Sequence, residues 1–199
     1  MNRKGAFICI EGLDGCGKTT QTKMLVRKLR KSYDAVYTAE PSDGKIGNFI
    51  RRRCLYGEKR LSSATEALLF AADRLEHVEN EVLPALRQGR VVVSDRYVYS
   101  SLAYQGAAGL SLDWIEKINK HALRVDFAAF IDVDPQTVMQ RLKPTRSVME
   151  NLETQQKVRN VYLKFVEKGE LFRIDGNNPQ SEVSARLFAA VLKALKTRR

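Results

Sequence analysis

Long hydrophobic runs are missing from this sequence. No stretch approaches the roughly 18 apolar residues that a helix needs to cross a bilayer. The apolar run at residues 5–10 follows a basic start, but it is too short to be the apolar region of a secretory signal. These absences argue against a membrane-spanning class and predict a cytoplasmic protein with no membrane partner.

Cysteine and histidine are also scarce. The three cysteines, Cys9, Cys16 and Cys54, are odd in number and show neither C-x-x-C nor Cys/His spacing. The sequence therefore predicts no disulfide framework and no zinc site, and we expect reduced thiols. The two histidines, His77 and His121, have no partner at metal-binding or proton-relay spacing and are expected to be structural or exposed.

Negative charge is in the minority. Asp and Glu number 23 against 34 Lys and Arg, which gives a formal net charge of +11. Such a field attracts polyanions of any kind, nucleic acids and nucleotide phosphates alike. The cations are scattered, however, with no basic tail and no helix-turn-helix, RRM or zinc-finger pattern. We therefore expect nucleotide partners and no specific nucleic acid.

The sequence does contain a regular alternation of two kinds of segment. Short apolar segments rich in β-branched or aromatic residues are typical of buried parallel strands. They lie at residues 5–11, 34–40, 90–95, 126–133 and 170–175. Segments with helical periodicity lie between and after them, at residues 18–31, 63–87, 148–169 and 178–196.

This alternation predicts an α/β fold, a five-stranded parallel sheet with helices on both faces and ligands at the carboxyl ends of the strands. The length of 199 residues suits one domain over residues 1–199. Within the segment 63–87, Ser63 and Glu66 predict a capping box at the start of the helix, and Pro84 predicts a late kink.

A phosphate-binding loop follows the first predicted strand and opens the first predicted helix. Its pattern is Gly12-x-x-x-x-Gly17-Lys18-Thr19, in which backbone N–H groups surround phosphate oxygens. Lys18 is expected at the β- and γ-phosphates and Thr19 at Mg²⁺, the predicted cofactor. The expected ATP-binding residues are Gly12, Leu13, Asp14, Gly15, Cys16, Gly17, Lys18, Thr19 and Thr20.

The end of the third predicted strand separates the classes of P-loop protein. The chain has no Asn-Lys-x-Asp element, which argues against a GTPase, and its "VVVSDRY" lacks the Asp-Glu pair of motor ATPases. Asp95 is followed by Arg96 instead. An arginine here suits a kinase, because a cation between donor and acceptor phosphates neutralises charge during transfer. Asp95 is expected to hold Mg²⁺ through water or to orient Arg96.

Several motifs together resemble the thymidylate kinase family. They occur in the same order and at matching separations over about residues 5–175 and read "FICIEGLDGCGKTTQ", "AEPSDGKIGNFIR", "ALLFAADRLEHV", "VVVSDRYVYSSLAYQG", "FIDVDP" and "QQKVRNVYL". The resemblance implies a P-loop nucleoside monophosphate kinase fold with a short lid. It implies phosphorylation of dTMP to dTDP with MgATP, in dTTP biosynthesis, by a homodimer packed through helices beside the sheet.

The resemblance also implies a pocket for the acceptor's base and sugar. Phe70 and Arg74 share one helical face at i, i+4 spacing; in this family the aromatic ring stacks on thymine and the arginine bonds a base carbonyl. Ser101 matches a polar residue that faces the base. Tyr104 matches the tyrosine that crowds the 2′ position of the sugar.

Other matches surround the acceptor's phosphate. Arg51 matches the arginine that holds the 5′-phosphate, although the match could slip to the neighbouring Arg52, and Arg96 is expected to contact the phosphate as well. Asp14 matches an acidic residue near the acceptor's 3′-hydroxyl and phosphate region. Glu40 and Pro41 match the "EP" that shapes the site. Where the family usually has a glycine pair next, this chain has Ser42 and Asp43.

The family's lid corresponds here to about residues 141–150, after a short helix expected to start at Pro135. Relatives with a small residue at the position of Gly15 supply a catalytic arginine from the lid. Arg146 is the first candidate for that role and Arg141 the second. The segment is shorter than in many relatives, and Met149 stands where they often carry an acid.

Two other interpretations stay open. Another nucleoside monophosphate kinase, or a deoxynucleoside kinase, would share the phosphate loop, but Phe70, Arg74 and Tyr104 favour a deoxypyrimidine monophosphate. A basic, ATP-regulated nucleic-acid-binding protein would explain the charge. It would leave Asp95 and Arg96 unexplained, and it predicts DNA binding that weakens steeply with salt.

Overall fold

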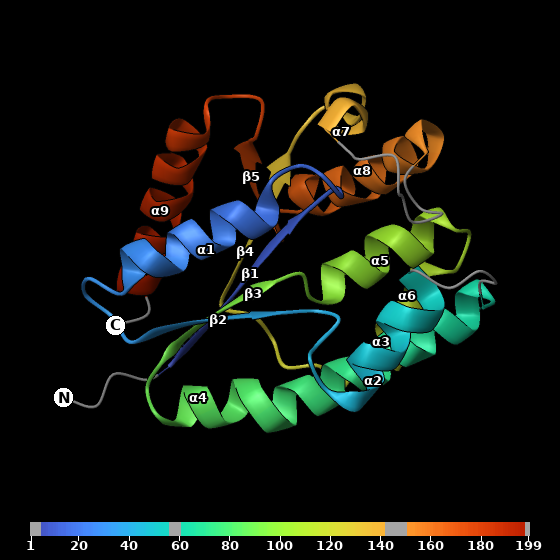
Figure 1. Cartoon of the computed structure of the whole chain (residues 1–199), viewed down its shortest axis with the longest axis horizontal. Coiled ribbons are helices and arrows are strands. Elements are labelled where there is room, and N and C mark those ends of the chain that lie inside the picture. Colours follow the sequence, from blue (N-terminus) through green and yellow to red (C-terminus); the bar gives the residue numbers. More distant parts are fainter. Residues whose placement is uncertain (1–4, 56–60, 142–150, 198–199) are drawn as a thin grey trace.

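The computed structural model describes residues 5–55, 61–141 and 151–197 and contains one five-stranded sheet (Figure 1). All the strand pairs are parallel and the order is β2-β3-β1-β4-β5. The strands are β1 Ala6–Gly12, β2 Ala35–Ala39, β3 Val91–Asp95, β4 Phe127–Asp132 and β5 Phe172–Asp175. The predicted five-stranded parallel sheet is confirmed, with each strand within two residues of its expected bounds.

The register of the strands brings their carboxyl ends to one edge of the sheet. Ile10 in β1 and Ala39 in β2 both lie opposite Asp95 in β3. The residues that follow β1 and β2 therefore meet Asp95 and its successor Arg96 at this edge. The register of the strands thus makes neighbours of the phosphate loop, the Glu40–Pro41 turn and the "DRY" segment.

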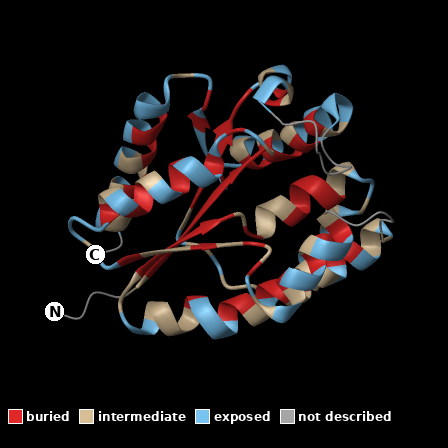
Figure 2. Ribbon diagram, in the orientation of Figure 1, coloured by how far each residue is buried: buried red, intermediate tan, exposed pale blue. Residues whose placement is uncertain are grey.

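Helices cover both faces of the sheet (Figure 1). On one face α1 Lys18–Leu29 packs beside α9 Gln180–Thr197. On the other, α5 Val98–Ala107 packs against α8 Leu152–Glu167 and against α3 Ser63–His77. Figure 2 shows buried residues along the strands and on the helix faces turned toward them. None of the helices among the described residues is long and apolar enough to cross a membrane.

The segment predicted as one helix over residues 63–87 consists of three consecutive helical parts. After α3, Val78–Val82 form a π-helical turn, and α4 Leu83–Arg87 completes it. Pro84 in the first turn of α4 has no N–H to donate, so the backbone ladder is interrupted there. The structure shows a π-helical turn before Pro84, and the late kink at Pro84 stays a prediction.

The capping box predicted from Ser63 and Glu66 is wrong. The N-cap is Ser62, whose backbone is extended and whose hydroxyl accepts from the Thr65 N–H at 3.2 Å. Ser63 is already helical, so the third helical position is Thr65 and not Glu66. The sequence offers two adjacent serines here, and only the backbone conformation chooses between them.

Shorter helices complete the fold. They are α2 Lys45–Ile50, continued by a π-helical turn Arg51–Leu55, with α6 Leu112–Ile118 and α7 Pro135–Arg141. The expected helix start at Pro135 is confirmed. The helix predicted over 148–169 is capped by Asn151 and runs from Leu152 to Glu167; residues 148–150 lie outside the described ones. The three cysteines are buried, and none of them forms a disulfide with another described residue.

Candidate active site

The phosphate loop joins the buried strand β1 to α1, as its sequence predicts. Gly15 and Gly17 have φ values of 81° and 91°, in the left-handed region that side chains other than glycine rarely adopt. These two residues reverse the chain between Gly12 and Lys18. The N-terminus of α1 is thereby directed at the space enclosed by the loop, which suits an anion.

Lys18 lies over this loop and is 6% exposed. Its Nζ donates to the Leu13 carbonyl at 3.2 Å and lies 3.5 Å from Asp14 Oδ1. An ammonium group held over a ring of backbone N–H groups concentrates positive charge at the point where phosphate oxygens would enter. Lys18 therefore lies at the loop, and its contact with the β- and γ-phosphates stays a prediction.

Thr19 and Asp95 form a second contact at the loop. The Thr19 hydroxyl donates to Asp95 Oδ2, and Tyr37 donates to the same oxygen at 3.5 Å. Asp95 is 5% exposed, and its Oδ1 has no partner within the part of the chain that the structure describes. Hydroxyl and carboxylate oxygens are the ligands that Mg²⁺ prefers, so this pair fits the predicted ion.

Protein ligands alone would not complete such a site. Among the described residues, no cluster of three or more His, Cys, Asp or Glu side chains is placed to hold a metal. Mg²⁺ in nucleotide enzymes commonly takes one or two protein ligands together with phosphate oxygens and water. The donor set therefore fits a nucleotide-bound ion better than a structural one.

Arg96 stands at the turn between β3 and α5 in an unusual conformation. Its φ is 76°, the only positive φ for a non-glycine residue within the described ranges. The guanidinium contacts Asp14 Oδ1 and donates to Ser100 Oγ at 2.9 Å. Its Cζ lies 4.9 Å from the ring centroid of Tyr104. Strained backbone of this kind persists where the surroundings hold it, and it concentrates at functional sites.

Asp14 links this arginine to the phosphate loop. It accepts from Tyr104 Oη at 3.0 Å, and its own N–H donates to the same oxygen at 3.1 Å. Burial alone would raise the pKa of Asp14, but the charges of Arg96 and Lys18 outweigh it and hold that pKa well below its usual range. In return, Asp14 overcomes the effect of burial on Arg96 and raises its pKa. Both groups are therefore charged near neutral pH.

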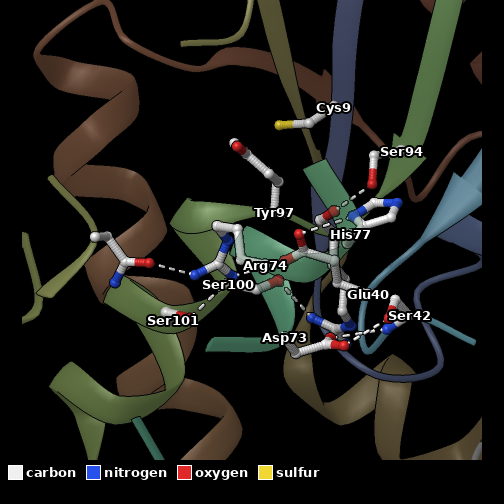
Figure 3. A network of polar contacts seen from close by, with 12 residues as sticks. Cys9, Glu40, Ser42, Asp73, Arg74, His77, Ser94, Tyr97, Ser100 and Ser101 are labelled. Atoms are coloured by element: carbon white, nitrogen blue, oxygen red, sulfur yellow. Dashed lines mark hydrogen bonds and ion pairs between the residues drawn. The ribbon is translucent and has the colours of Figure 1, made fainter. Parts of the chain in front are cut away.

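Arg74 is the centre of a second cluster, shown in Figure 3. The side chain is 1% exposed. Its terminal nitrogens donate to Glu40 Oε2 at 2.7 Å, to Ser101 Oγ at 3.2 Å and to Asn119 Oδ1 at 2.5 Å. The second Glu40 oxygen lies 3.1 Å from Nδ1 of His77.

These hydrogen bonds occupy both terminal nitrogens of the Arg74 guanidinium and do not involve its Nε. Among the described residues, no side chain or backbone group bonds Nε of Arg74. Phe70 lies one turn earlier on the same face of α3 and is half-buried. The predicted pair, Phe70 and Arg74, therefore shares one face of α3, and Ser101 of α5 lies beside Arg74. His77 is buried and structural and His121 is exposed, in agreement with the sequence.

Arg51 bonds the loop after Glu40, and its neighbour Arg52 does not. Arg51 donates to the Ser42 carbonyl at 2.7 Å and to the Pro41 carbonyl, and it lies 3.1 Å from Asp43. Arg52 is exposed and donates to the Asn48 carbonyl at 3.4 Å. The geometry therefore favours Arg51 for the acceptor loop.

Ser42, which stands where the family usually has glycine, bonds the loop to α3. Its N–H and its hydroxyl donate to the two oxygens of Asp73, at 2.8 and 2.6 Å. Asp73 is fully buried and adjacent to Arg74 on α3. The loop and the helix are thus joined twice, by Ser42 to Asp73 and by Glu40 to Arg74.

Four features of the site were missed in the sequence. Asn119 and Asp73 carry no signal, because each acts through a partner distant along the chain. Gln105 is buried and lies one turn after Ser101 on α5; its Oε1 has no partner in the portion of the chain that the structure describes. Its spacing from Ser101 could have identified it.

The fourth missed feature is a pocket of about 220 Å³ on the α1 side of the phosphate loop. It is lined by Gly17 of the loop, by Thr20 of α1, by Arg141, and by Asn178 and Gln180 after β5, among others. Arg141, predicted as a lid residue, therefore lies beside the phosphate loop. Arg146 and the rest of the predicted lid, residues 142–150, lie outside the described residues.

Comparisons with known proteins agree with this geometry. The family model described as thymidylate kinase matches residues 10–187. A probable thymidylate kinase of Pyrococcus abyssi is 45% identical over 179 residues, covering 86% of this chain and 87% of the relative. One of Pyrobaculum aerophilum is 37% identical over 193 residues, 96% and 98% of the two chains. One of Methanocaldococcus jannaschii is 41% identical over 169 residues, 85% and 86%.

Proposed function

The chain belongs to the thymidylate kinase family, and from that premise we propose which of its residues carry out the reaction. The enzyme transfers the γ-phosphoryl group of ATP to dTMP and releases dTDP and ADP, a step of dTTP biosynthesis. The observation that carries the assignment of roles is the contact of Arg96 with Asp14, which holds a partly buried cation directly beside the phosphate loop.

We propose direct in-line transfer without a covalent intermediate. An oxygen of the dTMP 5′-phosphate attacks the γ-phosphorus, the bond to the β–γ bridging oxygen breaks, and ADP leaves with that electron pair. The attacking phosphate is already an anion at neutral pH, so no general base is required. Catalysis is then positioning and charge neutralisation.

The cations of the site take separate parts in that neutralisation. Lys18 contacts the β- and γ-phosphates, and Arg96 lies between the donor and acceptor phosphates. Arg146 or Arg141 supplies a further cation when the lid, residues 141–150, closes and excludes water. The pocket lined by Arg141, Asn178 and Gln180 receives the nucleoside part of ATP, since it adjoins the phosphate loop.

Mg²⁺ would be held by Thr19 and Asp95. When bound, it neutralises charge on the β- and γ-phosphate oxygens. The support is the unpartnered and buried Oδ1 of Asp95 beside the Thr19 hydroxyl, within the described residues. Asp95 also adjoins Arg96 in sequence, so one turn of chain aligns the ion and the arginine.

The acceptor site lies between α3, α5 and the turn after β2. Phe70 stacks on the thymine, while Arg74, Ser101 and Gln105 present polar groups to its edge. Three residues contact or shape the rest of the acceptor: Tyr104 crowds the 2′ position, Asp14 approaches the 3′-hydroxyl, and Arg51 holds the 5′-phosphate.

Glu40 and Pro41 shape the acceptor site. The support for this part is the network that already orients Arg74 through Glu40 and Ser101.

We further propose a homodimer formed through α2 and α3. Leu68 and Leu75 lie seven residues apart on α3 and are 51% and 37% exposed, and Phe49 on the adjacent α2 is 41% exposed. These apolar side chains lie on neighbouring helices, as an interface requires. The remaining proposals are one domain over residues 1–199, a cytoplasmic location, where ATP and dTMP are found, and no specific binding of nucleic acid.

The experiment that tests the function is ADP release from MgATP with one acceptor at a time. The acceptors are dTMP, dUMP, dCMP, UMP, CMP, AMP and GMP, with a reaction lacking acceptor as the control. We expect the fastest release with dTMP and weaker release with dUMP. Faster turnover with a ribonucleotide, or equal turnover without acceptor, would contradict the acceptor assignment while leaving the ATP site standing.

A further inference from the structure

Glu11 is a buried carboxylate that the phosphate-loop pattern does not require. It lies at the end of β1, directly before Gly12, and is 0% exposed. Its oxygens nevertheless receive five donors from three segments of the chain. These are Tyr97 N at 2.9 Å, Ser100 N at 3.3 Å, Ser100 Oγ at 2.6 Å, Tyr162 Oη at 2.9 Å and Cys9 Sγ at 3.9 Å.

Two of these donors are backbone N–H groups at the start of α5. Tyr97 is the N-cap of α5, and no side chain of the helix itself caps that end. Glu11 supplies an acceptor from β1 for the Tyr97 N–H and a second acceptor for the Ser100 N–H, which also donates to the Tyr97 carbonyl at 3.0 Å. It also places a negative charge at the positive end of the helix. The turn held in this way begins immediately after Arg96, the residue with a φ of 76°.

A third donor connects Glu11 to the guanidinium. The Ser100 hydroxyl donates to Glu11 Oε2 and accepts from a terminal nitrogen of Arg96 at 2.9 Å. Because Glu11 takes the hydroxyl hydrogen, the lone pairs of Ser100 are left for Arg96. The other terminal nitrogen contacts Asp14, so the guanidinium is held from two directions.

We propose that Glu11 is a positioning residue for phosphoryl transfer: through Ser100 and the first turn of α5, it fixes the guanidinium of Arg96 beside the phosphate loop. This inference rests on the proposed role of Arg96 in catalysis. It assigns Glu11 no contact with either nucleotide, and it makes Ser100 the element through which Glu11 acts.

The charge balance around Glu11 supports this role. Burial raises its pKa, while hydrogen bonds from Ser100 and Tyr162 and the charge of Arg96 oppose that rise. Since all five direct contacts are donors, a glutamine here would turn an NH₂ group toward other hydrogens. Glu11→Gln keeps the volume of the side chain and breaks the arrangement, which makes it a suitable probe.

The test is a double-mutant cycle on steady-state ADP release, at high enzyme concentration and with the acceptor that gives the fastest wild-type rate. The single variants are Glu11→Gln, Ser100→Ala and Arg96→Ala, and the double variant joins Ser100→Ala to Arg96→Ala. Tyr162→Phe is the matched control: its hydroxyl donates to Glu11 and lies 3.1 Å from Ser100 Oγ, but the variant leaves in place the bonds that join Glu11 to Ser100 and Ser100 to Arg96. Thermal unfolding of each variant separates loss of fold from loss of positioning.

We expect Ser100→Ala and Glu11→Gln to lower kcat about 10-fold to 100-fold, the scale of a misplaced catalytic group. The KM values for both substrates should stay within about threefold, because the loss falls on the transition state. In the Arg96→Ala background, Ser100→Ala should cost nothing further. Tyr162→Phe should keep kcat within about threefold of wild type.

Three results would overturn the proposal. They are additive losses in the cycle, a Tyr162→Phe loss as large as that of Ser100→Ala, and single variants with wild-type kcat. If Glu11→Gln fails to fold, Ser100→Ala and the cycle decide alone. Failure of the proposed function appears separately, as a wild-type preference for an acceptor other than dTMP, and the cycle can be read with whichever acceptor is used.

Discussion

Replacing Glu40 by glutamine tests the buried network that orients Arg74. The substitution keeps the size of the side chain and removes one negative charge from a cluster in which Arg74 is 1% and Glu40 6% exposed. Glu40 holds Arg74 at 2.7 Å and His77 at 3.1 Å. The amide retains one acceptor for Arg74, while the guanidinium keeps a buried charge without its counter-ion.

The magnitude follows from that burial. A hydrogen bond to a charged group is worth about 1.5–3 kcal/mol, and removing one partner of a buried ion pair costs about 3–5 kcal/mol. Because the amide still bonds Arg74, we expect a loss of about 2–4 kcal/mol in the free energy of unfolding. In a domain of this size each kcal/mol moves the midpoint by about 2–4 °C, so the midpoint should fall by roughly 4–16 °C.

The chain offers a matched control for this substitution. Glu153 pairs with Lys157 at the same 2.7 Å, but both side chains are more than half exposed. Glu153→Gln should leave the midpoint unchanged within error, since exposed pairs contribute little. Thermal unfolding with and without dTMP measures both variants. Equal midpoints for Glu40→Gln and Glu153→Gln would refute the reasoning, because burial would then not determine how much an ion pair contributes to the free energy of unfolding.

The remaining predictions concern the acceptor site, the carboxylate of Asp14 and the proposed dimer interface. Arg51→Ala should raise the KM for dTMP about 10-fold to 100-fold, the worth of a charge-assisted bond, and Arg52→Ala less than about twofold; equal effects in steady-state assays would contradict the assignment. Burial raises the pKa of Asp14, but the neighbouring cations lower it by more, so the net pKa lies below the ordinary value. The stabilising charge of Asp14 is therefore present at pH 7 and is lost as the pH falls below that ordinary value, near 4. In urea unfolding the gap between wild type and Asp14→Asn should therefore narrow toward pH 3, and a constant gap would count against it. In sedimentation, Leu75→Glu should favour the monomer, and the same change at Leu152, which is 45% exposed on α8, should not; a monomeric wild type would exclude the dimer.

The parts of the fold that the sequence predicts are those determined by local pattern. The three central strands β1, β3 and β4 are short and apolar because both their faces are buried. The edge strands β2 and β5 are less buried, and the bounds of all five lie within two residues of those predicted. The phosphate loop depends on glycines at fixed spacing in one segment, and the reversal at Gly15 and Gly17 follows directly. Ser62 was missed as the cap because two neighbouring serines satisfy the same pattern.

The parts that escaped prediction are contacts between distant segments. Arg74 meets Asn119, which lies 45 residues along the chain, and Ser42 meets Asp73, 31 residues away. Nothing in the local sequence of Asn119 marks it, because its role is only to accept from a side chain on another helix. Gln105 could have been found from its spacing to Ser101 on α5, since that spacing places both on one face.

Three cations of the proposed site, Lys18, Arg74 and Arg96, are each paired with a carboxylate. Lys18 and Arg96 share Asp14, and Arg74 takes Glu40. The net charge of +11 is therefore not concentrated as unpaired charge at these positions. With the roles proposed for Lys18 and Arg96, nucleotide phosphates would compete with Asp14 for both of these cations. Because Asp14 is part of the phosphate loop itself, one loop residue holds both cations, while Ser100, bonded in turn to Glu11, holds the guanidinium of Arg96 from the other side.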